Sequence, residues 1–473
     1  MNAEIAVPKA GPEPLPELST YLFPFVRLFR RSESRQTLER YITGLLTDLP
    51  RKNCDTIAAA VAGTSTERLQ HLLTDASWDP EELDELRVRH LVAVTPPGGI
   101  LALDDTGLPK QGKASVGVAR QYSGTLGKVG NCQVVVSAEY VADEPTTSRP
   151  RHWPVTSRLY LPQAWADDPV RRKQTGVPPS VVFRTKLELA IEAIDRALAW
   201  GVPFRFVTAD AGYGDQPPFL AALDARGLEY VCAVEKTFGI RLPEEVDAAA
   251  SAVASEPGSS GAHRFGRPKL PRPAPLYTVE ALIGAQPETA WQTITWRTGT
   301  KGALTKQFLA VRAHRATGNP VAGKSERSTS HPRVSTGPEG WVLAERPLPG
   351  KSGDGDEVKY YFSNLSAETP MTRLVTIAHA RWAIEQFYED AKGECGFDDY
   401  QGRGWVGLHR HLAVVCLAYS FLTQLRTSDR TDTTDPADTG GIPPLRGLSD
   451  LSRHPSPGAR LVNPGSRSLV DRH

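Results

Sequence analysis

The fold is decided by Gly99-Ile-Leu-Ala-Leu-Asp104 and Phe204-Arg-Phe-Val-Thr-Ala-Asp210, two short apolar runs that each end in a carboxylate. Such runs predict buried strands. Residues 115–122 and 132–141 predict two further strands, joined through a glycine-containing loop. Helices are predicted over 185–200 and 217–225, with one more strand over 229–234. Three strands followed by alternating helices and strands predict an α/β fold.

Residues 19–95 predict an all-helical domain. Leu38, Tyr41, Ile42 and further apolar residues recur at helical spacing. A second helix is predicted over 55–62, and Thr64 with Glu67 forms a predicted capping box for a third. This pattern is compatible with a helix-turn-helix that binds DNA. An ordinary helical bundle with a solvated charged face explains it equally well.

The rest of the chain divides by composition. Two helices are predicted over 371–392 and 406–425, and the loops 255–261 and 316–338 show no periodicity. The predicted units are a flexible arm (1–18), the helical and DNA-binding domain (19–95), the first part of the core (96–236), a β-rich insertion (237–365), the second part of the core (366–426) and a disordered tail (427–473).

Charge and cysteine content exclude several classes of protein. Lys and Arg number 55 against 54 Asp and Glu, so any DNA-binding surface must come from local clustering. Five widely spaced cysteines without a CxxC pair favour neither a zinc site nor a disulfide framework. We find no signal segment and no apolar run of about 18 residues, and therefore expect no membrane contact and a cytoplasmic location.

The two strand-end aspartates are candidates for metal chemistry. Hard oxygen ligands that converge from separate elements are what two-metal phosphodiester chemistry requires. An aspartate at the end of a strand, taken alone, is more often a helix cap or a turn former than a metal ligand, and this applies to Asp104 and to Asp210. Arg381, Glu385 and Lys392 fall within roughly 40° of one another on a helix. The apolar residues around them favour a buried cleft over a solvated salt-bridged face.

A second cluster of cations and rings lies at residues 401–411. His409 and His411 are two residues apart, so on a helix they cannot share one face and a shared metal is not expected. Phosphate contact by Arg403, Arg410 and the histidines around Trp405 is one interpretation. A structural histidine pair is about as plausible.

Taken together, these motifs resemble a known family. Leu103-Asp-Asp-Thr-Gly107 and the residues that follow look like the first catalytic block of bacterial insertion-sequence transposases of the DDE superfamily. Asp210-Ala-Gly-Tyr-Gly214 resembles the second block. Arg381-x3-Glu385-x6-Lys392 matches the Arg-x3-Glu-x6-Lys signature of cut-and-paste members that carry a β-insertion.

The resemblance implies an RNase H-like catalytic core, a mixed sheet flanked by helices, in which Asp104, Asp210 and Glu385 are catalytic and hold two Mg²⁺ ions, with Mn²⁺ as a substitute. It implies a homodimer that binds the terminal inverted repeats of its element, cleaves there and joins the 3′-OH ends to target DNA in the bacterial nucleoid. The residues expected to contact DNA are Lys110, Arg120, Arg381, Lys392, Arg403, Trp405, His409, Arg410 and His411.

The resemblance leaves some assignments and alternative functions to consider. Asp104 rather than Asp105 is assigned as the ligand because the family pattern places the catalytic Asp before an acidic residue and Thr-Gly. The signature tyrosine falls at Ala378, and the neighbouring His379 is the candidate substitute. The alternative function is a domesticated, catalytically silent DNA-binding regulator. A two-carboxylate glycosidase is disfavoured because it leaves Arg381 and Lys392 unexplained.

Overall fold

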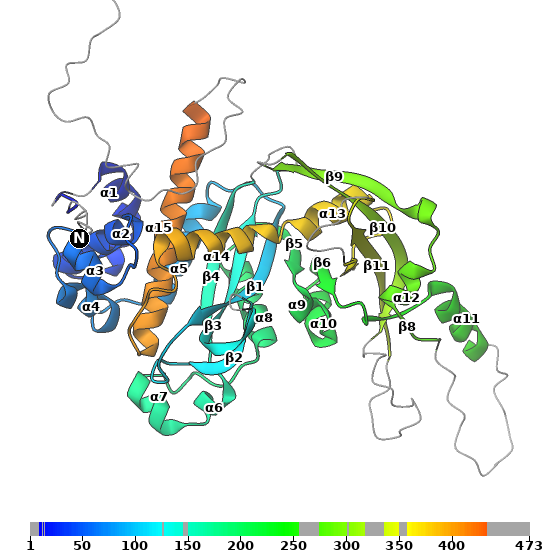
Figure 1. Ribbon diagram of the computed structural model, residues 1–473, viewed down its shortest axis with the longest axis horizontal. Coiled ribbons are helices and arrows are strands. Elements are labelled where there is room, and N and C mark those ends of the chain that lie inside the picture. The colour runs from blue at the N-terminus through cyan, green and yellow to red at the C-terminus, as the bar shows by residue number, and fades with distance from the viewer. Residues whose placement is uncertain are drawn as a thin grey trace, which may run out of the picture.

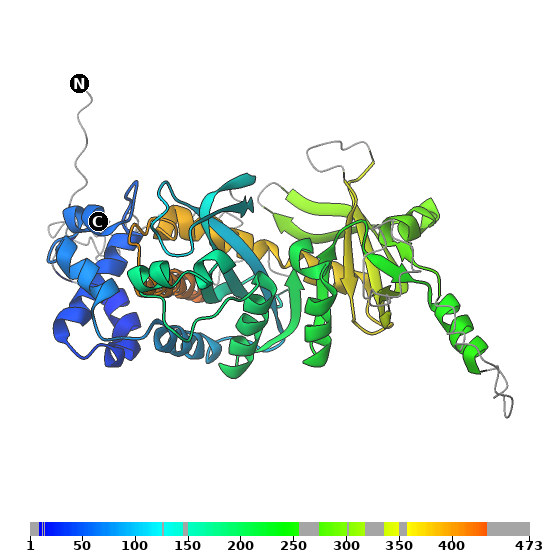
Figure 2. The same ribbon diagram turned by 90° about the horizontal axis from the view of Figure 1, so that it is seen from below.

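The computed structural model describes residues 9–11, 13, 15–124, 127–144, 150–254, 274–299, 302–316, 335–349 and 357–432. The chain forms an elongated molecule with the N-terminal helices at one end, a sheet flanked by helices in the middle and the β-rich insertion at the other end (Figures 1 and 2). The candidate site lies in the middle region.

The N-terminal region is helical, as the sequence predicts. The α4 helix is capped by Ser65, whose Oγ accepts from the backbone N–H of Arg68, so the predicted cap at Thr64 is wrong by one residue. The short α3 helix instead has a full capping box between Asn53 and Thr56. The helices are α1 (Pro16–Leu22), η1 (Phe23–Leu28), α2 (Ser32–Leu46), α3 (Cys54–Ala60), α4 (Thr66–Thr74) and α5 (Pro80–Val92).

The central strands form a mixed sheet in the order β2-β3-β1-β5-β6, with β4 paired to β3. Strand β1 is antiparallel to β3 and parallel to β5, which is parallel to β6. The β4 strand is missing from the sequence-based prediction because Pro154 interrupts its pattern, and the register shifts where Pro154 meets Glu139. The strands are β1 (Gly99–Pro109), β2 (Ala119–Ser123), β3 (Lys128–Val141), β4 (His152–Tyr160), β5 (Phe204–Ala209) and β6 (Glu229–Val234).

Helices cover the two faces of this sheet. On one face Leu101 and Val136 pack with Ile194 of α8, and on the other Ile100 and Val135 join the core of the C-terminal helices. The side chains of neighbouring residues in one strand thus pack into different hydrophobic cores, as the alternation of side chains along a strand requires. The helices between the strands are α6 (Gln163–Ala166), α7 (Pro169–Thr175), α8 (Lys186–Ala199), α9 (Ala211–Gly214) and α10 (Pro217–Ala225).

The β-rich insertion continues the central sheet, because β12 pairs antiparallel with β6. The remaining strands follow in the order β12-β11-β10-β7-β8, with β9 on β10. The predicted loop 255–261 and most of 316–338 lie outside the described residues. The elements are β7 (Gly239–Arg241), α11 (Pro243–Ala254), β8 (Tyr277–Thr278), α12 (Val279–Gly284), η3 (Glu288–Ala290), β9 (Gln292–Gly299), β10 (Gly302–Ala316), β11 (Thr336–Arg346) and β12 (Lys359–Ser363).

The helix predicted over 371–392 is in fact two helices, α13 (Met371–His379) and α14 (Trp382–Cys395). At the joint the backbone N–H groups of Ala383 and Ile384 bond to carbonyls three residues back, so the α-helical ladder is locally tightened. This joint places Arg381 at the start of α14. Figure 1 shows α13 and α14 running from the insertion to the central sheet.

The last described helix, α15 (Trp405–Asp432), packs against α4, α5 and β4. Its segment Trp405–Arg426 is long and apolar enough to cross a membrane, contrary to the expectation that no such run exists. However, 89% of the most apolar window is buried inside the fold, which is typical of a core helix. Of the predicted tail, residues 427–432 continue α15 and residues 433–473 lie outside the described part.

Candidate active site

Asp104 and Asp210 stand side by side because of the strand register. Leu103 of β1 is paired with Ala209 of β5 in a parallel arrangement, so the next residue on each strand is an aspartate. Adjacent strands are separated by about 4.8 Å, which brings the two carboxylates close to each other. Gly214 permits the turn after Asp210 to pack on β6, since a Cβ there would lie 2.0 Å from the carbonyl oxygen of Ala233.

The aspartate pair carries more negative charge than its surroundings neutralise. Burial, followed by the charge of Asp210, raises the pKa of Asp104 to about 8, although Arg381 opposes the shift. Burial also raises the pKa of Asp210. The Oδ1 atom of Asp210 is buried and has no hydrogen-bond partner among the described residues. An unpartnered buried carboxylate oxygen is costly unless a cation or a proton satisfies it.

Arg381 connects this pair to the helix that faces it. Its Nη1 lies 3.2 Å from Oδ2 of Asp104, and its Nη2 lies 2.5 Å from Oε1 of Glu385. The charges of Asp104, Glu385 and Asp210 all raise the pKa of Arg381. The side chain of Glu385 is 55% exposed, so it can leave Arg381 without crossing packed atoms. The structure thus brings the three predicted carboxylates around one guanidinium.

Asp105 faces the opposite side of the sheet, where it has two partners. Its Oδ1 accepts from the Lys186 ammonium at 2.9 Å, and its Oδ2 accepts from the Tyr213 hydroxyl at 3.1 Å. Sequence reasoning assigned no role to Lys186. A signal was present, because Lys186 is the first residue of α8 and a cation at a helix N-terminus opposes the helix dipole.

The two lysines predicted near the site bind backbone carbonyls of the protein. Lys392 Nζ donates to Thr106 Oγ1 at 2.6 Å and to the carbonyl of Gly107 at 3.3 Å. Lys110 Nζ donates to the carbonyls of Tyr400 at 2.7 Å and of Asp398 at 3.3 Å. Burial lowers the pKa of both lysines. Lys392 thus ties α14 to β1, and Lys110 ties the residue after β1 to the segment that follows α14.

The cluster at 401–411 is mostly inside the molecule, which corrects the expectation of phosphate contact for three of its residues. Arg410 is buried and donates to the carbonyls of Leu73, Ala76 and Trp78. His411 is buried, with Nδ1 2.8 Å from the Tyr41 hydroxyl and Nε2 3.0 Å from the carbonyl of Gly396. These contacts join α15 to the N-terminal helices.

The other members of that cluster divide between surface and interior. His409 is buried, and its Nδ1 lies 2.9 Å from the carbonyl of Trp405, whose ring it contacts. Trp405 is half-buried and Arg403 is exposed. Arg120, predicted from the first motif, is also exposed. Of these four residues, the two arginines are therefore the ones most open to a phosphate.

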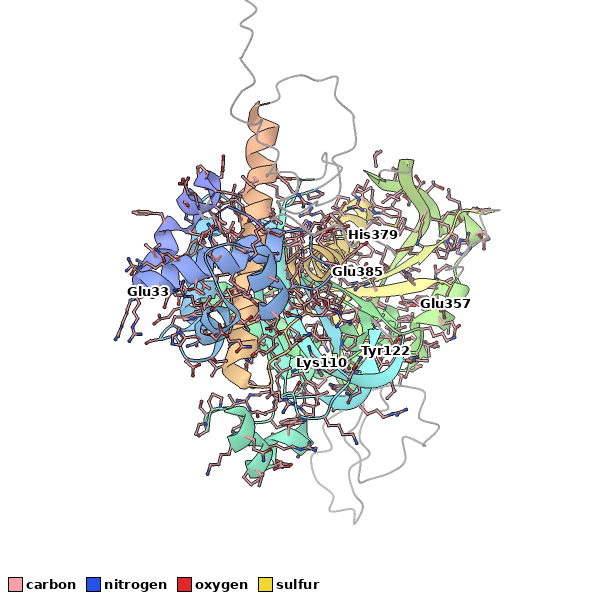
Figure 3. All side chains as sticks on the ribbon, turned by 60° about the vertical axis from the view of Figure 1, so that its left-hand side comes forward. Glu33, Lys110, Tyr122, Glu357, His379 and Glu385 are labelled. Atoms are coloured by element: carbon pink, nitrogen blue, oxygen red, sulfur yellow. The ribbon has the colours of Figure 1, made fainter. Side chains whose placement is uncertain are left out.

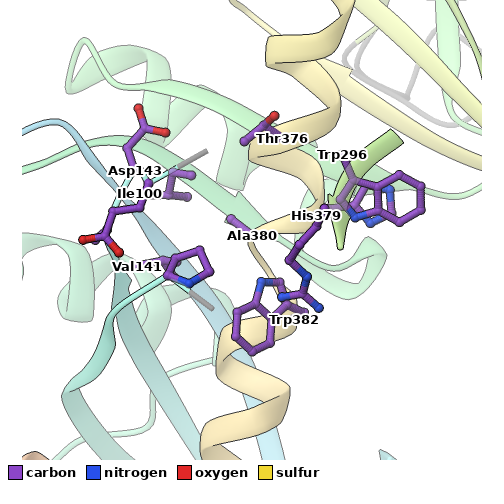
Figure 4. Close-up of a pocket in the computed structure, with 12 residues that line it drawn as sticks. Ile100, Val141, Asp143, Trp296, Thr376, His379, Ala380 and Trp382 are labelled. Carbon is purple, nitrogen blue, oxygen red and sulfur yellow. The ribbon is translucent and has the colours of Figure 1, made fainter. Parts of the chain in front are cut away.

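His379, the candidate substitute for the signature tyrosine, is held by contacts within the fold, and Ala378 is buried. The His379 ring stacks on Trp296 at 4.0 Å, and its Nε2 lies 3.0 Å from the Glu345 carboxylate. A small pocket opens beside this stack, between the start of β1, strand β9 and the joint of α13 and α14 (Figure 4). Arg297 lies over the Trp382 ring at 4.1 Å in its wall.

The donor set can be compared with what a divalent metal needs. Within the described part of the chain, no group of three or more carboxylate, histidine or cysteine side chains is arranged to hold a metal ion. Asp104 and Asp210 supply hard oxygen donors with unbalanced charge, which suits Mg²⁺ or Mn²⁺. Glu385 is a further carboxylate on the facing helix, and in this structure it is paired with Arg381.

Comparison with known proteins identifies the family of this chain. Residues 24–303 match the family described as DDE superfamily endonuclease. A protein of Microchaete diplosiphon described as "Probable transposase for insertion sequence element IS701" is 31% identical over 223 residues. The match covers 47% of this chain and 53% of that protein, so the chain spans about half the length of the curated relative.

Proposed function

We propose that this chain, which belongs to the DDE superfamily endonucleases, is an insertion-sequence transposase that cleaves DNA and joins 3′-OH ends to target DNA. Asp104, Asp210 and Glu385 are its proposed catalytic residues. One observation carries the proposal. The register of β1 and β5 places two under-neutralised aspartates beside a glutamate and an arginine from a separate helix. A DNA-binding regulator without catalytic activity would not require two buried aspartates whose negative charge the neighbouring groups do not neutralise.

Asp104 and Asp210 would hold the divalent cations, with Glu385 as the further carboxylate ligand. Bound Mg²⁺ would polarise the scissile phosphate and activate the attacking oxygen. Arg381 is already positioned between the carboxylates and is suited to clamp a phosphate through two parallel N–H donors. Lys392 keeps the end of β1 in place beneath it.

The DNA partners and the assembly are part of the same proposal. Terminal inverted repeats and target DNA are the expected substrates, bound by a homodimer because two element ends must be held together. The proposed setting is the bacterial cytoplasm, where chromosomal DNA is accessible. The domain limits given above and a DNA-binding role for the N-terminal helices are also proposals.

Plasmid nicking tests the catalytic assignment. Purified protein is incubated with supercoiled plasmid in a titration of Mg²⁺ or Mn²⁺, and nicked circles are measured over time. We expect nicking that depends on divalent ions and is lost in Asp104→Asn and Asp210→Asn. The matched control is Asp195→Asn, which removes a carboxylate from an exposed ion pair with Arg226.

Two results would contradict the proposal. Nicking by either site variant at the wild-type rate would remove that aspartate from the reaction. Tight DNA binding without any nicking or joining by the wild-type protein would support the catalytically silent regulator instead.

A further inference from the structure

The geometry points to a second contact with DNA, a strip of the β2–β3 hairpin that binds target DNA without regard to its sequence. We call Arg120, Tyr122 and Val129 the hairpin strip. This inference rests on the proposed function, since it names where the target duplex lies relative to the site. It starts from strand alternation, which fixes the side of the sheet on which each residue stands.

The hairpin strip shares a sheet face with Asp104. Asp104 is paired with Ser137 of β3, and opposite residues of an antiparallel pair point to one side. The register of β3 continues without a shift to its start, so every second residue from Ser137 back to Val129 stands on that side. Tyr122 lies opposite Val129, and Arg120 is two residues from Tyr122.

The distance along this face matches a length of duplex. Val129 is eight residues from Ser137, which corresponds to about 26 Å at the rise of a strand. A duplex that joined the aspartates to the hairpin strip would span about eight base pairs, and it would lie outside the helices that cover this face, because Val135 and Gln133 are buried. Lys110 lies between the two positions, and Figure 3 shows Lys110 and Tyr122 below Glu385 in the same view.

Charge and exposure favour a polyanion. Residues 106–138 contain no Asp or Glu. Arg120 is exposed, and no acidic side chain among the described residues is paired with it. Tyr122 is 63% exposed and Val129 is 50% exposed, so an aromatic and an aliphatic side chain stand open beside the arginine. A cation next to an open ring is the composition that contacts phosphate and sugar.

The hydrogen bonds of the hairpin indicate that its contact with DNA does not depend on the base sequence. Amide side chains often read base edges, but the Asn131 amide donates to the carbonyls of Lys110 and Gly112. The Gln121 amide donates to the carbonyl of Cys132. The open side chains of the hairpin strip therefore offer charge and ring surface without an amide. Target DNA is the substrate that suits such a surface, whereas element ends must be recognised by sequence.

A second copy of the chain is the competing occupant, because β2 is an edge strand of the sheet. Edge strands can pair with another molecule, and cations on them are a common protection against that pairing. The two occupants differ in what the side chains would do. Phosphate binding makes affinity depend on salt, whereas strand pairing changes the oligomeric state.

The experiment compares the two faces of one hairpin. Binding of a random-sequence 30-base-pair duplex is measured by fluorescence anisotropy across a salt series, in Ca²⁺ or EDTA so that cleavage does not interfere. The variants are Arg120→Ala and Tyr122→Ala. The matched control is Lys128→Ala, since Lys128 lies opposite Ser123 and therefore on the other face.

We expect Arg120→Ala to reduce the slope of log K against log salt by about one unit. Tyr122→Ala should weaken binding by about fivefold at every salt concentration and leave the slope unchanged, as expected for the loss of one neutral hydrogen bond to the DNA backbone. Lys128→Ala should leave both quantities near the wild-type values. All three residues are exposed, so the variants should fold, and equal melting temperatures verify this.

Four outcomes would overturn the inference. The first is wild-type binding by both hairpin-strip variants, and the second is an equal loss in Lys128→Ala. The third is a loss confined to a duplex taken from the DNA that flanks the coding region, which would indicate element ends. The fourth is an altered oligomeric state by light scattering with unchanged DNA binding, which would indicate a second copy. Plasmid nicking is scored separately, so failure of the proposed catalysis would leave these binding results readable.

Discussion

The aspartate pair in the core and Glu345 in the insertion are two carboxylate environments of opposite kind. Glu345 has a 1% exposed side chain with three partners: the Lys306 ammonium, the His379 ring and the Tyr361 hydroxyl. Burial raises its pKa, but hydrogen bonds and charges of His379 and Lys306 outweigh that effect and hold the pKa at about 2. The pKa of Asp104 instead rises to about 8.

The contrast distinguishes a structural carboxylate from one that is ready for a ligand. Glu345 is neutralised within the fold and joins β11, β10 and α13, so nothing further is needed to stabilise it. The aspartates share one guanidinium, and an oxygen of Asp210 has no partner among the described residues. Charge left unbalanced in a fold is found where function requires it. Each prediction below tests that difference.

The largest expected difference is in catalysis. Asp104→Asn should lower the rate of plasmid nicking on the order of a thousandfold, because a lost metal ligand removes several kcal/mol of transition-state stabilisation. Glu345→Gln should nick at close to the wild-type rate under conditions where it is folded. Rates are taken from the initial formation of nicked circles. A Glu345 variant as inactive as Asp104→Asn would erase the distinction.

The second difference is in stability and has the opposite sign. Glu345→Gln should lose about 3 kcal/mol of unfolding free energy, since it strips a buried ion pair of one partner. Asp210→Asn should lose none in the absence of metal, because it removes a charge that burial disfavours. Urea unfolding at pH 7 measures both. Matching losses in the two variants would show that Asp210 is as structural as Glu345.

The contribution of Glu345 to the free energy of unfolding should also depend on pH. A carboxylate whose folded pKa is below its ordinary value of 4.5 contributes stability above that pH and loses it as the pH falls toward 2. The difference between wild type and Glu345→Gln should therefore shrink between pH 4.5 and 2. A difference that stays constant over this range would mean that the charge of Glu345 is not what stabilises the insertion.

The third difference concerns divalent ions. Mn²⁺ at a hundred times its dissociation constant should stabilise the wild-type protein by about 2.7 kcal/mol, since it binds only the folded state. The melting temperature should rise accordingly in wild type and in Glu345→Gln. Asp104→Asn should show little rise. A rise of equal size in Asp104→Asn would locate the cation elsewhere.

The sequence was sufficient for the parts of the fold that depend on local pattern. The strands that carry Asp104 and Asp210 and the helix that carries Glu385 follow from apolar periodicity. The predicted strand end at Asp104 is wrong, because β1 continues to Pro109. The assignment of Asp104 over Asp105 needed the family resemblance, because alternation says that the two differ in face but not which face is the site. The contacts of Asp105 with Lys186 and Tyr213 then supply a separate role for it.

Features that depend on contacts between residues far apart in the sequence could not be predicted from the sequence. Burial of Arg410 and His411 requires α15 to lie against the N-terminal helices, more than 300 residues away in sequence. The break at Ala380 leaves no mark in the apolar period, so one helix was predicted where two exist. The pairing of β12 with β6, which merges the insertion with the core sheet, likewise depends on the assembled fold.

The smallest predicted effect concerns Asp105, which acts at a distance from the reacting atoms. It joins the middle of β1 to the start of α8 through Lys186 and to the turn after Asp210 through Tyr213. We infer that it is a positioning residue that holds Asp210 beside Asp104. Asp105→Asn should therefore lower nicking by about tenfold, as is common when a partner that orients a metal ligand is changed. The Mn²⁺ concentration for half-maximal nicking should rise as well, which a purely structural role would not predict.

Lys186→Met should produce the same change, and the double variant should be no worse than either single variant, because the effects of residues in one network are not additive. Additive losses, or a lowered melting temperature with an unchanged Mn²⁺ requirement, would reduce Asp105 to an ordinary packing contact and leave the position of Asp210 to its own backbone.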